Sequence, residues 1–404
     1  MVKQNTKPKL RFSEFTDEWE NMKLGEIASF SKGKGISKAE ISENVGTECI
    51  RYGELYTRYN EVIDKVYSKT NIDKKNLILS ESNDVIIPAS GETQIDIATA
   101  SCVIKSGIAL GGDLNIIKTS QNGVFLSYYL NNRKKIDIAN LAQGISVVHL
   151  YSSQLATLNL NLPTLPEQTR IASFLTAVDD KISQLKQKKT LLEKHKKGIM
   201  QKIFSQQIRF SDDNGKDYPD WDEKKLNEVL TIQGGYAFKS ENFNKGVTKV
   251  FRIGDILPNI NIQAFTGVYS SELPNDKYKV SKNDFLMALS GATFGKVGKI
   301  YDDGLGYINQ RVATFRTTQC LEFFYQLVQT VNFKNYINSI PTASAQPNIS
   351  NDDIGNYITI IPSLPEQTKI ANFLSAIDDK INHTSTQLEK MQQWKKGLLQ
   401  QMFC

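Results

Sequence analysis

The sequence predicts an α+β fold: two globular α/β domains form a tandem pseudo-two-fold repeat and are separated by two long helices that pair as an antiparallel coiled coil. Three observations support this prediction. The segment 163–182, PTLPEQTRIASFLTAVDDKI, recurs 199 residues later at 362–381 as PSLPEQTKIANFLSAIDDKI. Each copy opens a heptad pattern of apolar residues, and the stretches before the copies alternate short β-rich runs with turns. The chain therefore consists of two equivalent halves.

Each copy of the repeated segment carries the signals of a helix start. Thr164 and Ser363 stand three residues before Glu167 and Glu366, which is the capping-box spacing, so the helices should begin near 164 and 363. A helix of about 39 residues spans roughly 58 Å. The heptad seam is Ile171, Leu175, Val178, Ile182, Leu185, Lys189, Leu192, Lys196, Ile199 and Ile203 in the first copy, and Ile370, Leu374, Ile377, Ile381, Thr384, Leu388, Met391, Lys395, Leu398 and Met402 in the second.

The polar residues of the seam predict how the two helices pair. In an antiparallel register in which residue i faces residue 573 − i, Leu185 meets Leu388 and the polar Lys189 meets Thr384. A parallel pair would spoil two layers instead of one. Each buried aliphatic side chain contributes about 1.5–3 kcal/mol and an isolated polar intrusion costs a comparable amount, so antiparallel pairing is favoured.

Two further lysines interrupt the seam. In the antiparallel register Lys196 faces Ile377 and Lys395 faces Val178. We expect both lysines to bury their aliphatic stems and extend their ammonium groups into solvent.

The duplication extends beyond the helices. Each half opens with an Arg-Phe pair, Arg11-Phe12 or Arg209-Phe210, that leads through an acidic segment to a tryptophan. The predicted boundaries are 1–162 for the first globular domain, 163–206 for the first spacer helix, 207–361 for the second globular domain and 362–404 for the second spacer helix.

Composition and motifs argue against an enzyme. The net charge of +6 is compatible with a polyanion partner but does not require one. The four cysteines and three histidines have no metal-site or catalytic spacing, and no apolar run approaches the length of a membrane span, so we expect a cytoplasmic protein with reduced thiols.

The Asn/Asp-Pro-Pro-aromatic signature of amino-methyltransferases is absent, and the loop 291–297 is too short for a phosphate-binding loop. The pairs Asp179-Asp180 and Asp378-Asp379 are interpreted as solvated charge.

The duplicated Leu-Pro-Glu-Gln segment resembles the spacer helices of specificity (S) subunits of type I restriction-modification enzymes, and the resemblance covers essentially the whole chain. It implies a non-catalytic subunit with two target-recognition domains that reads a bipartite double-stranded DNA sequence, one half-site per domain. It also implies that the subunit docks two modification subunits, which methylate adenine N6 with S-adenosylmethionine, and restriction subunits, which use ATP and Mg. The alternative is a specificity module of another DNA-modifying phage-defence complex without restriction activity.

The two halves differ just before their helices. The first half reads QGISVVHLYSS where the second keeps AQPNIS at 345–350, so contacts inferred for this loop in the second half transfer less securely to the first.

Sequence is read chiefly by Arg, Lys, Asn and Gln side chains at base edges, so loop residues of these types, with nearby Ser, Thr and Tyr residues, are the candidate DNA contacts. In the first domain they are Lys32, Lys34, Arg51, Tyr52, Arg58, Ser90, Thr93 and Gln94. In the second they are Lys239, Arg252, Ser290, Thr293, Lys296, Asn309, Gln310, Arg311, Gln346 and Asn348.

Overall fold

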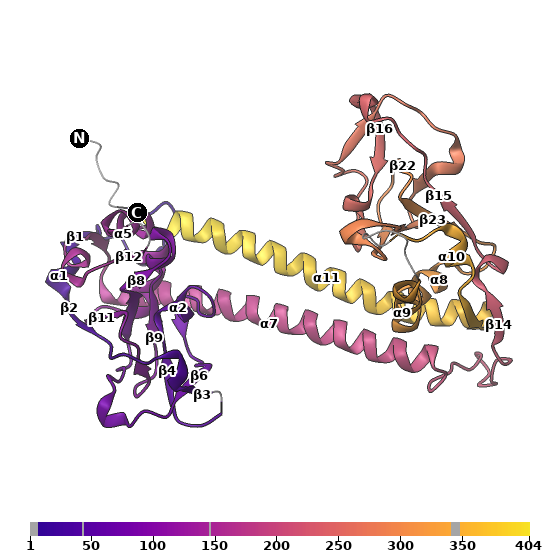
Figure 1. Ribbon diagram of the computed structural model, residues 1–404. Helices are drawn as coiled ribbons and strands as arrows, with labels where there is room; N and C mark the ends of the chain where they lie inside the picture. The colour runs from indigo at the N-terminus through magenta and orange to yellow at the C-terminus, as the bar shows by residue number, and fades with distance from the viewer. Residues whose placement is uncertain (1–6, 43, 145–146, 341–347) are drawn as a thin grey trace. The chain divides into compact units, whose positions relative to one another are not determined.

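The computed structural model describes residues 7–42, 44–144, 147–340 and 348–404 (Figure 1). The chain divides into two compact units: unit 1 comprises Met1–Gln187 with Ser385–Cys404, and unit 2 comprises Lys188–Thr384. Each unit contains mixed sheets and short helices, and each long helix contributes one part to each unit. The predicted α+β fold with two long helices is therefore confirmed.

Unit 1 is built on a five-stranded sheet and a four-stranded sheet. The five-stranded sheet has the order β2 (Ala28–Lys32), β11 (Leu114–Thr119), β7 (Asp84–Pro88), β9 (Ser101–Val103) and β5 (Val62–Ile63). The four-stranded sheet has the order β10 (Ala109–Leu110), β4 (Thr47–Ile50), β6 (Ser68–Thr70) and β3 (Ile41–Ser42), and the pairs are β1 (Glu20–Lys23) with β13 (Asn159–Leu162) and β8 (Ser90–Gly91) with β12 (Val148–His149). Its short helices are α1 (Leu24–Ile27), α2 (Tyr52–Leu55), α3 (Gln94–Ile97), α4 (Gly123–Asn132), α5 (Lys135–Leu141) and α6 (Ser152–Leu155).

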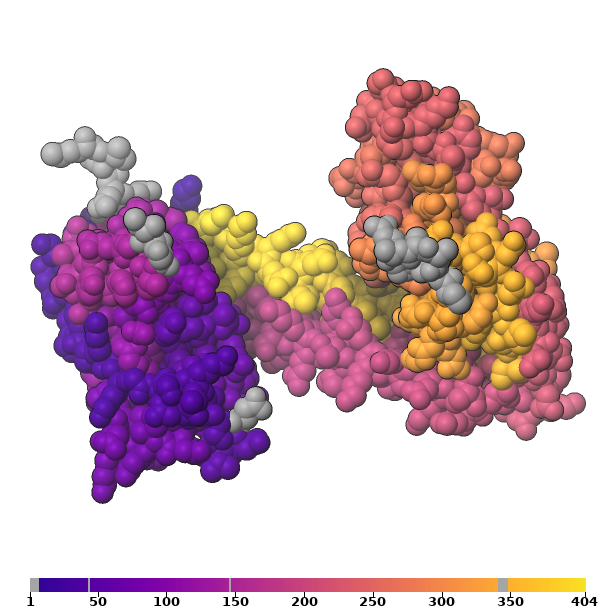
Figure 2. All heavy atoms as spheres, viewed as in Figure 1, coloured from indigo at the N-terminus to yellow at the C-terminus, as the bar shows by residue number. Residues whose placement is uncertain are grey.

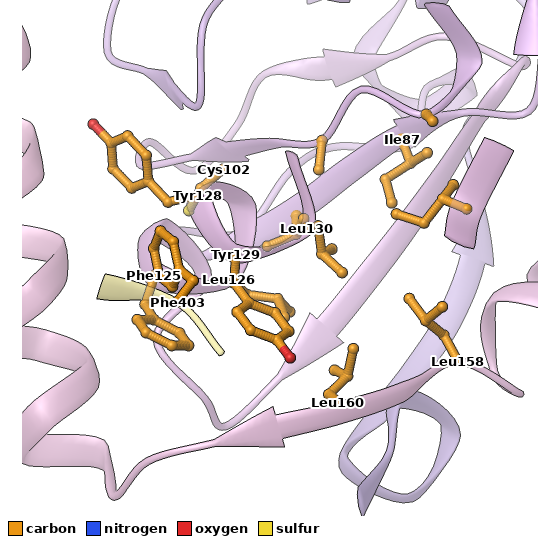
Figure 3. Packing of buried hydrophobic residues seen from close by; sticks show 14 of the residues in the cluster. Ile87, Cys102, Phe125, Leu126, Tyr128, Tyr129, Leu130, Leu158, Leu160 and Phe403 are labelled. Atoms are coloured by element: carbon orange, nitrogen blue, oxygen red, sulfur yellow. The ribbon is translucent and has the colours of Figure 1, made fainter. Parts of the chain in front are cut away.

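The core of unit 1 joins residues that are far apart in the sequence. Phe125 and Tyr129 of α4 are fully buried, and the ring of Phe403, just beyond the C-terminal helix, packs edge-on against both (Figure 3). Burying an aromatic side chain of this size contributes about 1.5–3 kcal/mol. The segment that ends the sequence is therefore part of the first unit's core.

Unit 2 repeats this plan. Its five-stranded sheet has the order β15 (Thr231–Gly234), β23 (Val312–Arg316), β20 (Phe285–Ala288), β21 (Val297–Ile300) and β17 (Asn259–Ile260). Its four-stranded sheet has the order β18 (Val268–Ser270), β16 (Phe243–Phe251), β22 (Leu305–Ile308) and β19 (Lys279–Ser281), and β14 (Asp222–Lys225) pairs with β24 (Ile358–Ile361). Its short helices are α8 (Leu321–Leu327), α9 (Val331–Ser339) and α10 (Asn351–Gly355).

The two units share their strand pairing as well as their element order. In each, the last strand of the five-stranded sheet along the chain, β11 or β23, lies between two antiparallel neighbours. In each, the four-stranded sheet contains one parallel pair, β4 with β10 or β16 with β22. One difference is that β16 is a single strand with a register shift between Phe243 and Thr248, where unit 1 has the separate strands β3 and β4.

The long helices are α7 (Leu165–Phe204) and α11 (Leu364–Met402), so both predicted starts are confirmed. All twenty seam positions are buried or half-buried. Unit 1 contains the N-terminal part of α7 and the C-terminal part of α11, whereas unit 2 contains the opposite parts. Because each helix is continuous, the two run antiparallel, as predicted, and in Figure 2 their side chains meet.

The predicted capping boxes are wrong, because the glutamates at the starts of the long helices have other partners. In the first copy Arg11 donates to both carboxylate oxygens of Glu167 at 2.7 Å. In the second copy Arg209 and the indole N–H of Trp221 donate to Glu366 at 2.9 and 3.0 Å. The carboxylates therefore bind side chains from the start of their own half rather than the backbone of the helix cap.

These carboxylates are buried, with Glu167 1% and Glu366 0% exposed. The hydroxyl of Ser363 is buried without a hydrogen-bond partner, so it does not cap its helix. The repeated arginine, the repeated tryptophan and the repeated glutamate are separate signals in the sequence. In each unit of the structure, the arginine and the tryptophan both donate hydrogen bonds to the glutamate.

The prediction that two seam lysines extend into solvent is also wrong. Lys196 donates to both oxygens of Asp378 at 2.7 and 2.8 Å, and Lys395 lies 2.7 Å from Asp179. Asp179 and Asp378 are therefore ion-pair partners rather than solvated charge. The two pairs differ by one residue from the predicted register, and the contact of Leu185 with Leu388 stays a prediction.

Candidate nucleic-acid interface

In unit 2, candidate residues follow neighbouring strand ends. Phe251 of β16 and Ile308 of β22 are partners in a parallel pair, so Arg252 and Asn309 leave the sheet at the same edge. The backbone N–H of Asn309 donates to the carbonyl of Phe251 at 2.9 Å. This backbone bond fixes the spacing of the two side chains that follow.

The ends of β20 and β23 bring further candidates to this region. Ser290 forms an antiparallel bridge with Asn348, and the guanidinium of Arg311 donates to the side-chain oxygen of Asn348 at 3.0 Å. The backbone N–H of Leu289 donates to the carbonyl of Arg311 at 2.9 Å, which holds the two loops together.

We call this group the polar edge of unit 2. Its members are Arg252, Ser290, Thr293, Lys296, Asn309, Gln310, Arg311 and Asn348. Five of them are exposed, and they are Arg252, Lys296, Gln310, Arg311 and Asn348. Such exposed cationic and amide side chains suit phosphate and base-edge contacts.

Two candidates of the second half lie elsewhere. The backbone N–H of Lys239 donates to Glu272 at 3.0 Å, in a different loop. Gln346 lies outside the described residues.

Unit 1 builds the corresponding edge with the same kind of strand pairing. Ile50 of β4 pairs in parallel with Leu110 of β10, and Arg51 follows at once. The backbone N–H of Lys34 donates to the carbonyl of Leu110 at 3.0 Å, which brings this exposed lysine beside Arg51. Two basic candidates, Lys34 and Arg51, therefore lie next to each other at the end of the β4–β10 pair.

Arg51 and Arg252, which follow the equivalent strands β4 and β16, differ in the surroundings of their side chains. The Nε atom of Arg51 is buried and has no hydrogen-bond partner among the described residues. The Nε atom of Arg252 lies 3.8 Å from Asp255. Glu54, the corresponding acid of unit 1, instead receives a hydrogen bond from Ser68 and lies 3.8 Å from Arg58.

The remaining candidates of unit 1 have mixed environments. Ser90 is buried, with 8% of its surface exposed. The hydroxyl of Thr93 accepts from the backbone N–H of Asp96 at 3.1 Å and so caps α3. Tyr52 and Gln94 are exposed at the starts of α2 and α3.

Sequence reasoning missed His149 and Tyr151. His149 pairs with Ser90 as Asn348 pairs with Ser290, and the backbone N–H of the next residue bonds in both units to the residue before that serine. The signal was the alignment of 143–155 with 342–354, in which the histidine stands opposite the asparagine. We define the polar edge of unit 1 as Lys32, Lys34, Arg51, Ser90, His149 and Tyr151.

A cavity of about 590 Å³ lies in unit 2 between α7, α9 and α11. Lys196, Lys334, Tyr301 and Asp378 are among the residues that line it. Burial raises the pKa of Tyr301 to about 12, so this phenol stays protonated at neutral pH. The described lining contains hydroxyls, amides and charges but no cysteine or histidine, so it offers no Cys-His or Ser-His pair.

The described residues include no group of three or more His, Cys, Asp or Glu side chains arranged to hold a metal ion. Among the described helices, none is both long and apolar enough to cross a membrane.

The chain is thus a duplicated protein whose two units share one frame, and that frame carries exposed cationic and amide side chains of the kind that suit a polyanion. The family model for the type I restriction modification DNA specificity domain matches the chain twice, at residues 16–194 and 218–393, so the chain belongs to this family. The family predicted from the repeated segment is confirmed.

Relatives and solved structures agree with this assignment. The chain is 26% identical over 406 residues to the type I restriction enzyme MjaVIII specificity subunit of Methanocaldococcus jannaschii, covering 95% of this chain and 91% of the relative. It is 20% identical to the EcoKI specificity subunit of Escherichia coli, covering 85% and 79%. The crystal structure of the S subunit of a type I restriction-modification system from M. genitalium has a TM-score of 0.67 at 16% identity, covering 98% and 99% of the two chains, and supports the fold.

Proposed function

We propose that this chain is the non-catalytic subunit that reads a bipartite DNA target, one half-site per unit, and docks the modification and restriction subunits of its system. The observation that carries the proposal is the pair of polar edges: the same backbone bonds hold different side chains in the two units. Two different half-sites require different reading surfaces, whereas a shared frame suits repeated partner subunits.

The chemistry is assigned to the partners in this proposal. Modification subunits bring S-adenosylmethionine and methylate adenine N6, and restriction subunits bring ATP and Mg. The net charge of +6 and the exposed lysines and arginines favour DNA, because their binding to phosphates releases counterions, a contribution that weakens as the salt concentration rises. The work takes place in the cytoplasm, where the target DNA is accessible.

The test is to express the chain with two modification subunits and to map N6-methyladenine by long-read sequencing. We expect one bipartite motif with the complex and no methylation or cleavage by the purified chain alone. Exchange of residues 10–150 for the equivalent part of another such subunit should alter only one half of the motif. Methylation by the isolated chain, or an exchange that rewrites both halves, contradicts the proposal.

Adding restriction subunits separates the proposal from its alternative. Cleavage of unmethylated DNA by the full assembly supports a restriction-modification system. Methylation with no cleavage, in an assembly that contains every subunit of the system, supports a modification complex without restriction.

A further inference from the structure

The polar edge of unit 1 carries an aromatic pair where unit 2 carries small polar residues. His149 and Tyr151 occupy the places of Asn348 and Ser350. The turn is the same, because the backbone N–H of Tyr151 bonds to the side chain of Gln154 at 2.8 Å as that of Ser350 bonds to Asp353 at 2.8 Å. The side chains therefore differ on an unchanged backbone.

The two rings of the aromatic pair stack on each other and face solvent. The rings of His149 and Tyr151 stack with centroids 6.3 Å apart and planes 22° apart, and the ammonium of Lys32 lies 5.8 Å from the centre of the Tyr151 ring. Tyr151 is 47% exposed, and His149 and Lys32 are exposed as well. The chain thus leaves a large aromatic surface and a cation uncovered on the polar edge that also holds Arg51 and Lys34.

Unit 2 has an amide side chain, that of Asn348, at the position that His149 occupies in unit 1. The oxygen of Asn348 accepts from Arg311, so its side-chain NH₂ group remains to donate outward. An imidazole N–H at the same position is also a donor, but its reach and its ring plane differ. A donor is what the N7 and O6 acceptors of a purine require in the major groove.

We propose that His149 is a specificity-determining residue that donates a hydrogen bond to a purine acceptor in the first half-site. Tyr151 is a positioning residue that fixes the imidazole plane by stacking, and Lys32 binds an adjacent phosphate. This inference rests on the proposed function, and it adds residues and a contact chemistry to one half-site.

The test uses the full chain assembled with its modification subunits, mapped by methylome sequencing and by equilibrium binding to duplexes that carry the bipartite site. His149→Asn installs the residue that unit 2 has at this place. We expect it to change base preference at one position of the first half-site by about tenfold and to leave the second half-site unchanged.

The neighbouring residues give distinct expectations. Tyr151→Ser should weaken binding and relax preference at the position read by His149, and Tyr151→Phe should restore both, since it keeps the ring. Lys32→Ala should weaken binding to all sequences and reduce the salt slope by about one. The control is Ile104→Asn, which changes a 40% exposed side chain just beyond β9, at the opposite end of the five-stranded sheet from the polar edge.

Some outcomes would overturn the inference. Unchanged base preference in both His149→Asn and His149→Ala would remove the role of the imidazole. An equal change in Ile104→Asn would show a general effect on folding instead. Failure of the proposed function is a separate result, because the unsubstituted complex would then yield no bipartite motif at all.

Discussion

Unit 1 and unit 2 share one backbone frame, yet their polar edges present different groups. Unit 1 presents Lys34, Arg51 and a His149-Tyr151 stack, whereas unit 2 presents Arg252 and the Arg311-Asn348 pair, among others. Equivalent backbone bonds join the loops in both units, and the turns that begin at Tyr151 and Ser350 each use a side-chain acceptor as well. The difference teaches that frame and contact surface can change independently, because backbone pairing does not depend on the side chains that it carries.

The largest expected effect concerns the buried glutamates. Glu167→Ala should destabilise unit 1 by about 3–5 kcal/mol, since it leaves Arg11 and Trp19 without their buried acceptor. Glu366→Ala should cost less in unit 2, because Arg209 also donates to two backbone carbonyls, those of Tyr218 and Pro219. Hydrogen exchange resolved by unit measures the loss of stability in each variant. An equal loss in both variants, or a larger loss in Glu366→Ala, would contradict this prediction.

A smaller effect is expected at the ion pairs of the long helices. Lys395→Met leaves Asp179 and Glu61 without their shared cation and should cost about 3 kcal/mol. Lys196→Met leaves one carboxylate, that of Asp378, without its cation, so a smaller cost is expected. Each aspartate keeps one hydrogen-bond donor in its variant, Tyr128 for Asp179 and Gln326 for Asp378. Denaturant unfolding monitored in each unit gives the two values, and a larger loss for Lys196→Met would contradict this account.

The contact surfaces should respond without loss of stability. Arg311→Ala should weaken binding of the second half-site by about 1–3 kcal/mol, because it removes a cation and frees the Asn348 side chain. Arg51→Ala is the matched change in unit 1 and should affect only the first half-site. Binding to duplexes in which one half-site is scrambled separates the effects on the two half-sites. A variant that weakens binding to the other unit's half-site would contradict the assignment of one polar edge to each half-site.

The smallest expected effect is a pH dependence from Asp84 and Asp284. Burial raises the pKa of each carboxyl above its usual value near 3.8, against backbone hydrogen bonds and nearby cations that lower it. The folded state then holds the proton more tightly than the unfolded state, so stability falls as pH rises through the window above 3.8.

Asp84→Asn should remove this fall in unit 1 at a cost of about 1 kcal/mol, because the amide oxygen can still accept from the backbone N–H of Glu81. Asp284→Asn should be less favourable, because it takes the carboxylate partner from Arg316. Unfolding free energies measured at several pH values test both, and an unchanged pH slope in Asp84→Asn contradicts the prediction.

The parts of the fold that could be predicted from the sequence are those with a local or repeated pattern. The starts of α7 and α11 were predicted from the spacing of Thr164 to Glu167 and of Ser363 to Glu366, although the capping boxes themselves do not form. The buried seam follows from heptad spacing, and the antiparallel direction was predicted from the places of Lys189 and Thr384. The duplication predicted the division of the chain into two equivalent halves. All these predictions depend either on residues close together in the sequence or on a comparison of the two copies.

The contacts that could not be predicted are long-range. The spacing of Glu167 to Thr164 indicates a cap because that spacing is local, whereas the real partner of Glu167, Arg11, lies at the start of the same half. The position of His149 on the polar edge was missed because its pairing with Ser90 joins two segments that are far apart in the sequence. The polar edges form where strand ends meet, and strand order is not encoded in spacing.

The division of the chain into units has a consequence for synthesis on the ribosome. Unit 2 is one continuous segment, whereas the core of unit 1 includes Leu398, Met402 and Phe403. At a synthesis rate of about 5–20 residues per second, the first part of unit 1 waits roughly 10 to 40 s for residues 385–404. The apolar surface of α4 and α7 that these residues cover is exposed during that time. The first half of the gene product therefore finishes folding last.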